Sequence, residues 1–206
     1  MSPYDELARL GSATIYEAGG RRGFVDADMH RIVPGSRAAG PARTVRCGQG
    51  DNLMVHAAMA EVCVGDVLVL TMPEPAPFAL FGDLLATQAS EQGAAAVLVD
   101  ASVRDVDDLA ELGLPVWARY IRIQGATKQA VGEIDVPVVV GGATIRPGDA
   151  IVLDGDGIAV VPADDVTTVL DAAHEREARE AAKREQLQTG RLSYDLDGLR
   201  AIVEGA

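Results

Sequence analysis

The stretch GDLLATQASEQGAAAVLVDASVRDVDDL, residues 82–109, contains the pattern that decides the fold. It predicts a helix over 84–92, a buried strand over the apolar run 95–100 and a second helix over 106–112. Just before it, the continuous apolar run VLVLT at 67–71 predicts another buried strand. Helices that alternate with fully apolar strands are typical of a layered α/β protein with a partly parallel sheet.

Short elements are predicted on both sides of this unit. Helices are expected at 3–10, 13–18 and 52–62, strands within 31–47, 115–120 and 136–142, a proline-rich loop over 72–79, and a hairpin over 143–162.

The C-terminal part has a different composition. A long helix is predicted over 163–190, and its second half is mostly alanine and charged residues, so it has little to bury on its own domain. We therefore expect it to project over a partner subunit, followed by a small helix over 193–203. The prediction is one domain, with an α/β body over 1–162 and a helical arm over 163–206 at a subunit interface.

Composition limits the functional classes. The chain has 206 residues, of which 48% are apolar and 24% charged, and its net charge is −13. An acidic protein repels phosphate backbones, so nucleic acid is not expected as a partner. No apolar run approaches the roughly 20 residues that span a bilayer, and the N-terminus lacks a secretory pattern. We therefore expect a cytoplasmic protein, with Cys47 and Cys63 as buried thiols.

Three acids stand at predicted helix starts, and two interpretations stay open for them. Asp83 and Asp105 each precede a helix, and Asp108 follows three residues later. As N-caps they would each stabilise a helix by about 1 kcal/mol and have no other role. Alternatively, they belong to a site at the carboxyl ends of the strands, where open α/β sheets bind ligands.

The second interpretation gives each group a chemical role. Free N–H groups of Leu84 and Leu85 at a helix N-terminus suit a carboxylate, and Arg104 could bind the same anion. Asp105 offers a hard oxygen ligand to Mg²⁺, which often takes one or two carboxylates and keeps several waters. The other two acids could hold those waters. A metal, an arginine and a helix end around a 2-oxo acid would stabilise an enolate.

The acids and the arginine also form a D-x20-R-D-x2-[ED] pattern, and the likeness extends along the chain. Similar segments include ATIYEAGGRRG (13–23), GDN (50–52), GDVLVL (65–70), FGDLLAT (81–87), GLPVWAR (113–119) and PGDAIVLDGDGIAVVP (147–162). The sequence resembles the class II pyruvate aldolases that cleave 4-hydroxy-4-methyl-2-oxoglutarate and 4-carboxy-4-hydroxy-2-oxoadipate, within the RraA-like group. This resemblance implies a swivelling phosphohistidine-type α/β sandwich, a trimer or hexamer, and an oxaloacetate decarboxylase side activity.

The resemblance also implies roles for individual residues. Asp105 would bind Mg²⁺ or Mn²⁺ directly, and Asp83 and Arg104 would be catalytic. Asp83 and Asp108 would contact the metal through water. Glu180, or Glu177, of a neighbouring subunit would do the same. Substrate binding is implied for Gly82, Leu84, Leu85, Arg104, Asn52 and His56.

Rival functions remain at this stage. The RraA-like group includes a regulator that inhibits an RNA-degrading endonuclease, but that pattern lacks the last acid, which is Asp108 here. A phosphohistidine carrier would need a histidine on an exposed glycine-rich loop, and none fits. Lys128 could form a Schiff base, although a surface lysine is the better prediction. The acids at 154–156 fail the calcium-loop pattern, so a hairpin turn is expected there.

Overall fold

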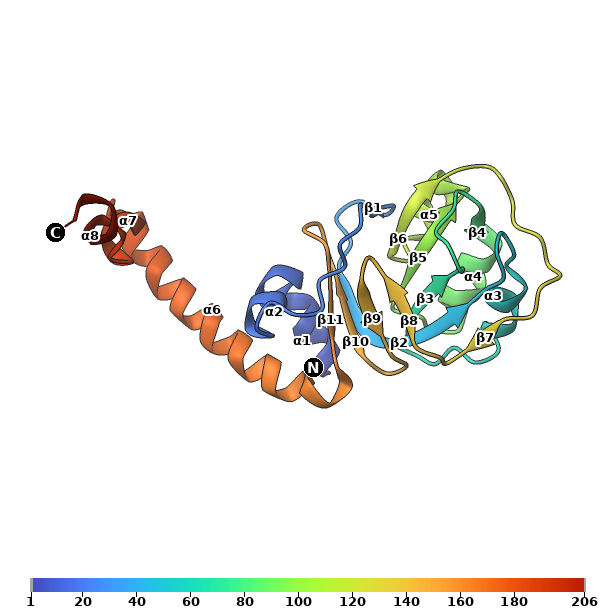
Figure 1. Cartoon of the computed structure of the whole chain (residues 1–206), viewed down its shortest axis with the longest axis horizontal. Coiled ribbons are helices and arrows are strands. Elements are labelled where there is room, and N and C mark those ends of the chain that lie inside the picture. Colours follow the sequence, from blue (N-terminus) through green and yellow to red (C-terminus); the bar gives the residue numbers. More distant parts are fainter. Residues whose placement is uncertain (1, 206) are drawn as a thin grey trace.

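The computed structural model describes residues 2–205 and contains a large mixed sheet with helices around it (Figure 1). Within these residues the sheet runs in the order β1-β6-β5-β3-β2-β10-β11, with β4 beside β5 and β7 beside β2. The strands are β1 (His30–Arg31), β2 (Ala38–Arg46), β3 (Val67–Thr71), β4 (Ala79–Phe81), β5 (Ala96–Val103), β6 (Val116–Ile121), β7 (Glu133–Ile134), β10 (Ala150–Leu153) and β11 (Ile158–Val161).

The centre of the sheet is parallel and the edges are antiparallel. β2, β3, β5 and β6 pair in parallel, whereas β1, β7, β10 and β11 pair with their neighbours in antiparallel fashion. All residues of β3 and β5 are buried. Strands covered on both faces read as continuous apolar runs, which explains the sequence pattern at 67–71 and 95–100.

Three buried clusters hold layers against the sheet. The first lies under α3 (Leu53–Ala58), α4 (Asp83–Glu91) and α5 (Val106–Leu112) and includes Leu70 and Val99. The second includes Val140 and Ile145 of a separate hairpin, β8 (Val138–Val140) and β9 (Ala143–Ile145). The third joins β10 and β11 to α1 (Pro3–Leu10), α2 (Ser12–Ala18) and the start of α6 (Val166–Gln188). The predicted α/β fold is confirmed.

The C-terminal helices extend away from this body (Figure 1). A 3-10 turn, η1 (Ala163–Asp165), leads into α6, of which only Val169 and Ala173 are buried. The short helices α7 (Ser193–Leu196) and α8 (Leu199–Glu204) lie at its far end and pack mainly on each other. Placement of this arm at a subunit interface stays a prediction.

Several local predictions need correction. The helix predicted over 52–62 ends at Ala58, and Gly198 divides the predicted last helix into α7 and α8. The expected loop 72–79 leads directly into β4, which is too short to give a sequence pattern. Cys47 is buried and burial raises the pKa of its thiol to about 12, but Cys63 is exposed, in the turn that leaves α3.

The turn at 154–157 has a structural role, as expected. β10 and β11 form the predicted hairpin. Asp154 at its turn accepts hydrogen bonds from N and Oγ of Ser12, at 2.7 and 2.6 Å, and so fixes the start of α2. Over residues 2–205, no helix has the length and apolar character needed to cross a membrane.

Candidate functional site

Strand register brings the two halves of the Asp–Arg–Asp pattern together. β4 pairs in parallel with the end of β5, and Phe81 lies opposite Val103. The next residues are Gly82 after β4 and Arg104 after β5. The two segments therefore leave the sheet at the same edge, where they enter α4 and α5. The carboxyl ends of parallel strands are where α/β sheets bind ligands.

Gly82 allows these two chain segments to approach closely. Its φ of −161° is ordinary extended backbone. A Cβ atom there would lie 2.6 Å from Oδ2 of Asp105 and 3.2 Å from Cγ of Arg104. Any side chain at this position would therefore push the carboxylate and the arginine away from the start of α4.

Asp105 occupies the N-cap position of α5 without acting as a cap. Its side chain makes no capping hydrogen bond, and its backbone is left-handed, with φ 58° and ψ 41°. Oδ2 instead accepts long contacts from the backbone N of Asp83, at 3.3 Å, and from Nε of Arg104, at 3.4 Å. Asp83 also makes no capping hydrogen bond. An aspartate in the left-handed region that does not cap its helix is a feature of functional sites.

The first turn of α4 supplies backbone donors at the same place. Gly82 is the N-cap of α4 and has no side chain with which to satisfy the amides of that turn. The N–H group of Asp83 donates to Asp105, whereas those of Leu84 and Leu85 have no partner inside the helix. Leu84 is 78% exposed. These amides can receive a carboxylate.

A cavity of about 100 Å³ adjoins this helix end. Seven of the residues predicted for substrate binding and catalysis line it, namely Asn52, His56, Gly82, Asp83, Leu84, Leu85 and Arg104. Asp105 borders the group through its contacts with Asp83 and Arg104. Ala79, Leu80, Phe81, Ala126 and Lys128 complete the lining, and Lys128 is the polar residue that the sequence interpretation placed outside the site.

Asn52 and His56 line the same cavity as the start of α4. Asn52 is 8% exposed, and its Nδ2 donates to the carbonyl of Leu80 at 3.0 Å. That bond fixes the amide orientation, because a carbonyl oxygen needs a donor, and it leaves Oδ1 buried with no partner among residues 2–205. Partial burial, and then the charge of Lys128, lowers the pKa of His56, so its imidazole is neutral at pH 7.

Two predicted groups lie apart from the cavity in this chain. Asp108 is exposed on the first turn of α5 and does not line it. Glu180 is on α6, beyond the opposite end of the sheet from α4 (Figure 1), where it pairs with Arg176 at 2.7 Å. Glu177 pairs with Arg9 at 2.6 Å. Either glutamate could serve the site only from another copy of the chain, as the sequence interpretation required.

The donor set matches a hard cation that keeps much of its water. Within residues 2–205, no three histidine, cysteine or acidic side chains converge as a metal cluster. Mg²⁺ is bound through as few as one or two carboxylates. Asp105 has weak contacts at only one of its oxygens, so its carboxylate is available for that role.

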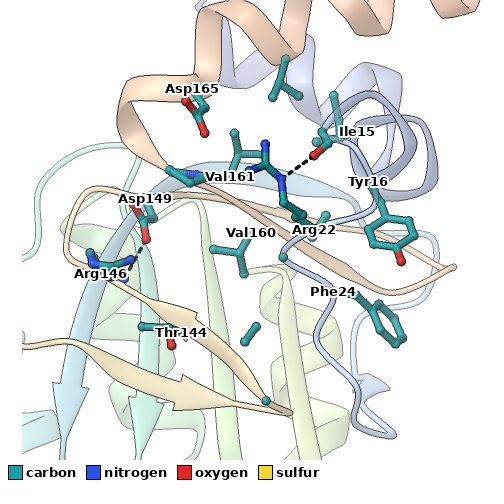
Figure 2. Close-up of a pocket in the computed structure, with 17 residues that line it drawn as sticks. Ile15, Tyr16, Arg22, Phe24, Thr144, Arg146, Asp149, Val160, Val161 and Asp165 are labelled. Atoms are coloured by element: carbon teal, nitrogen blue, oxygen red, sulfur yellow. Dashed lines mark hydrogen bonds between the residues drawn. The ribbon is translucent and has the colours of Figure 1, made fainter.

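A second cavity, about 310 Å³, lies between α2, β9, β11 and the start of α6 (Figure 2). It also contains acids and arginines, and the carboxylate of Asp149 is used in the fold. Asp149 accepts from the backbone N of Arg146 at 2.8 Å and of Ala163 at 3.1 Å. Arg22 donates to the carbonyl of Gly19 at 3.3 Å. Asp165, the N-cap residue of α6, also lines this cavity and makes no side-chain capping hydrogen bond.

Sequence and structure comparisons agree with this architecture. Residues 11–160 match the RraA-like family, described as Aldolase/RraA. A Halalkalibacterium halodurans protein named "Putative 4-hydroxy-4-methyl-2-oxoglutarate aldolase" is 37% identical over 168 residues, which cover 82% of this chain and 78% of that protein.

Two solved structures share the fold over most of their length. An uncharacterized protein from Pseudomonas syringae pv. tomato has a TM-score of 0.81 and 27% identity, covering 92% of this chain and 94% of that one. Streptomyces coelicolor RraAS2, described as an unusual member of the RNase ES inhibitor RraA family, has a TM-score of 0.78 and 32% identity, covering 88% and 95%.

The fold and the site at the strand ends define a layered α/β protein with a candidate anion and metal site. The family match covers most of the chain, so this chain belongs to the RraA-like family.

Proposed function

We propose that this protein is a divalent-metal-dependent class II aldolase, which cleaves a 4-hydroxy-2-oxo acid into pyruvate and a second carbonyl compound. The observation that carries the proposal is the junction of α4 and α5, where two free helix amides, Arg104 and Asp105 meet beside a cavity. The relative named as an aldolase supports the same reaction class. Following the resemblance, the substrates are 4-hydroxy-4-methyl-2-oxoglutarate or 4-carboxy-4-hydroxy-2-oxoadipate.

The groups of this chain divide the work in the following way. The amides of Leu84 and Leu85 bind the carboxylate next to the 2-oxo group. The guanidinium of Arg104 donates to the keto oxygen and stabilises the negative charge that develops there as the C3–C4 bond breaks. When bound at Asp105, Mg²⁺ or Mn²⁺ would supply Lewis-acid polarisation of the same oxygen.

Proton transfer needs two further groups. Asp83 lines the cavity and orients a water that delivers a proton to the enolate carbon, giving pyruvate. Oδ1 of Asn52 has no partner among residues 2–205 and can accept a hydrogen bond from the substrate hydroxyl, whose proton passes to that water as the C3–C4 bond breaks. Loss of CO₂ from oxaloacetate passes through the same enolate, so we expect that decarboxylation as a side activity. Asp108 and a neighbouring copy's Glu180 would hold metal waters in a trimer or hexamer.

The test measures pyruvate release with a coupled lactate dehydrogenase assay. Activity is expected with Mg²⁺ or Mn²⁺ and should be lost with a chelator. Asp105→Asn should lower kcat at least about 100-fold, because the amide keeps the shape and tolerates the left-handed backbone but loses the charge. Asp107→Asn, on the same helix turn, is the matched control. Metal-independent turnover, or full activity in Asp105→Asn, contradicts the proposal.

A second function has a specific basis in the comparisons. RraAS2 is described as a member of an RNase inhibitor family, and it shares this fold. Under this alternative the chain would bind an RNA-degrading endonuclease. A pull-down with that endonuclease separates the two functions, since the aldolase assignment predicts no binding that survives Mg²⁺ and physiological salt.

A further inference from the structure

The second cavity, between α2, β9, β11 and the start of α6, has the composition of a small-molecule site. Its volume of about 310 Å³ lies at the lower end of the roughly 300–1,000 Å³ of such sites, which are mostly apolar with a few polar groups. The rings of Tyr16 and Phe24 lie 5.9 Å apart, and Phe24 is 51% exposed. The aliphatic lining consists of Ile15, Ala159, Val160, Val161 and Val169. A ligand of this cavity therefore needs a small apolar part.

Arg22 supplies this cavity with a positive charge that the fold does not use. Its Nε donates to the carbonyl of Gly19 at 3.3 Å, and within residues 2–205 its Nη atoms make no hydrogen bond or salt bridge. The next residue, Gly23, has φ 76°, and a Cβ atom there would clash with the carbonyl oxygen of Val160. Only glycine lets this segment lie so close to β11, where the backbone N of Val160 donates to the carbonyl of Gly23 at 2.8 Å. The guanidinium therefore extends from a fixed backbone position.

Asp165 supplies the cavity with a negative charge that is equally unused. It is the N-cap residue of α6, but its side chain makes no capping hydrogen bond and no salt bridge with any residue in the range 2–205. Its backbone position is fixed, because its N donates to the carbonyl of Pro162 at 2.9 Å and the N of Ala163 donates to Asp149 at 3.1 Å. A group that is already held in place loses less freedom when a ligand binds.

The two unpaired charges lie on the same side of the cavity. In Figure 2 the guanidinium of Arg22 points from its loop toward α6, and Asp165 lies at the start of that helix. Arg146 lies apart from them, beside Asp149, whose oxygens accept from backbone N–H groups. Arg22 and Asp165 both line the cavity without pairing with each other, so a ligand can contact both.

We propose that the second cavity binds a free α-amino acid with an apolar side chain. The α-carboxylate accepts from the Nη atoms of Arg22, whose planar fork matches a carboxylate, and the α-ammonium donates to Asp165. The side chain packs against the aliphatic lining, below Phe24. Two opposite charges beside an apolar wall match a zwitterion, because a ligand with one charge would leave the other protein group unpaired. This site is separate from the cavity at α4 and does not depend on the proposed function.

The test compares L-leucine with analogues that each lack one group. 4-Methylpentanoate lacks the ammonium, 3-methylbutylamine lacks the carboxylate, and glycine lacks the side chain. Titration calorimetry on the full-length protein should show that leucine binds about tenfold more tightly than either singly charged analogue, as expected for one charge-assisted hydrogen bond in a partly exposed position. Glycine should bind at least about tenfold more weakly than leucine, because it buries no apolar side chain.

Each of two substitutions should remove one preference and keep the other. Arg22→Gln should bind leucine and 3-methylbutylamine equally and still prefer leucine over 4-methylpentanoate. Asp165→Asn should bind leucine and 4-methylpentanoate equally and still prefer leucine over 3-methylbutylamine. The matched controls are Arg21→Gln and Asp164→Asn, which change adjacent residues of the same type outside the cavity lining and should keep both preferences.

Arg104→Gln checks the location, because it alters only the cavity at α4 and should leave the affinity for leucine unchanged. The inference is overturned if the wild type binds no leucine, or binds it no more tightly than the three analogues. It is also overturned if Arg22→Gln or Asp165→Asn keeps both preferences, if a control variant loses one, or if Arg104→Gln abolishes binding.

Discussion

Aspartates and arginines line both the cavity at α4 and the cavity of Figure 2, but the hydrogen bonds of these aspartates differ. Asp149, beside the second cavity, accepts hydrogen bonds from the backbone N–H groups of Arg146 and Ala163, at 2.8 and 3.1 Å. Asp105, beside the first, receives only two contacts longer than 3.2 Å, although it occupies a helix N-cap position. One carboxylate stabilises the fold, and the other is left available.

This difference shows how an acid that stabilises the fold can be distinguished from one that is available for a ligand. A buried carboxylate whose oxygens are occupied by backbone donors has little capacity for a ligand. A carboxylate held near a helix start without capping it keeps lone pairs for a cation. Asp149 directly precedes β10 whereas Asp105 is the N-cap residue of α5, so the two aspartates differ both in position and in hydrogen-bond partners.

The largest effect is expected for the arginine of the first cavity. Arg104→Ala should lower kcat for pyruvate release by about 10²–10³-fold, because it removes the donor at the oxygen where charge develops. The free energy of unfolding should change little, since Arg104 is half exposed and its pairing with Asp105 is long. Steady-state kinetics and urea unfolding measure the two quantities.

Arg146→Ala is the matched control for that substitution, because it removes an arginine from the lining of the second cavity. We expect near wild-type kcat. If Arg146→Ala lowers kcat as much as Arg104→Ala does, the assignment of the two cavities is wrong.

The next effect is on stability, at the second cavity. Asp149→Ala leaves the backbone N–H groups of Arg146 and Ala163 without their acceptor in a buried position. We expect a loss of about 3 kcal/mol in the free energy of unfolding, while the folded enzyme keeps its kcat. Asp105→Asn should cost less than about 1 kcal/mol in the same urea experiment. Equal losses for the two variants would show that Asp105 also stabilises the fold.

Much of the fold could be predicted from the sequence, because its signals are local. The apolar runs at 67–71 and 95–100 became fully buried strands, and the helices at 3–10 and 106–112 have the predicted bounds. β4 could not be predicted, because a three-residue strand gives no pattern and is stabilised by tertiary contacts, namely its pairing with β5 and the burial of Leu80 and Phe81. The separate β8–β9 hairpin likewise depends on tertiary packing.

The sequence predicted the part of the candidate site that lies at the carboxyl ends of the strands. A site at strand ends was expected from the strands predicted at 67–71 and 95–100, but the strand that leads to Asp83 is β4, which the sequence did not predict. Lys128 gave no such signal, because its loop has no periodicity and is placed by a hydrogen bond network centred on Asp51, far away in sequence. The unpartnered Oδ1 of Asn52 could not be inferred either, since burial and hydrogen bonding depend on the complete fold.

The smallest effect concerns His56 and pH. Burial and the nearby Lys128 lower the pKa of His56 from 6.5, so the imidazole is neutral at pH 7 and gains its proton only at a lower pH. A substrate carboxylate bound beside His56 favours the protonated form, and by linkage protonation strengthens substrate binding. We therefore expect KM for the proposed dicarboxylic substrates to fall about threefold as the pH falls from 7 to 5.5, consistent with an exposed ion pair. In His56→Gln this fall in KM should be absent. Among the described residues no histidine lines the second cavity, so Arg146→Ala should leave this pH dependence unchanged.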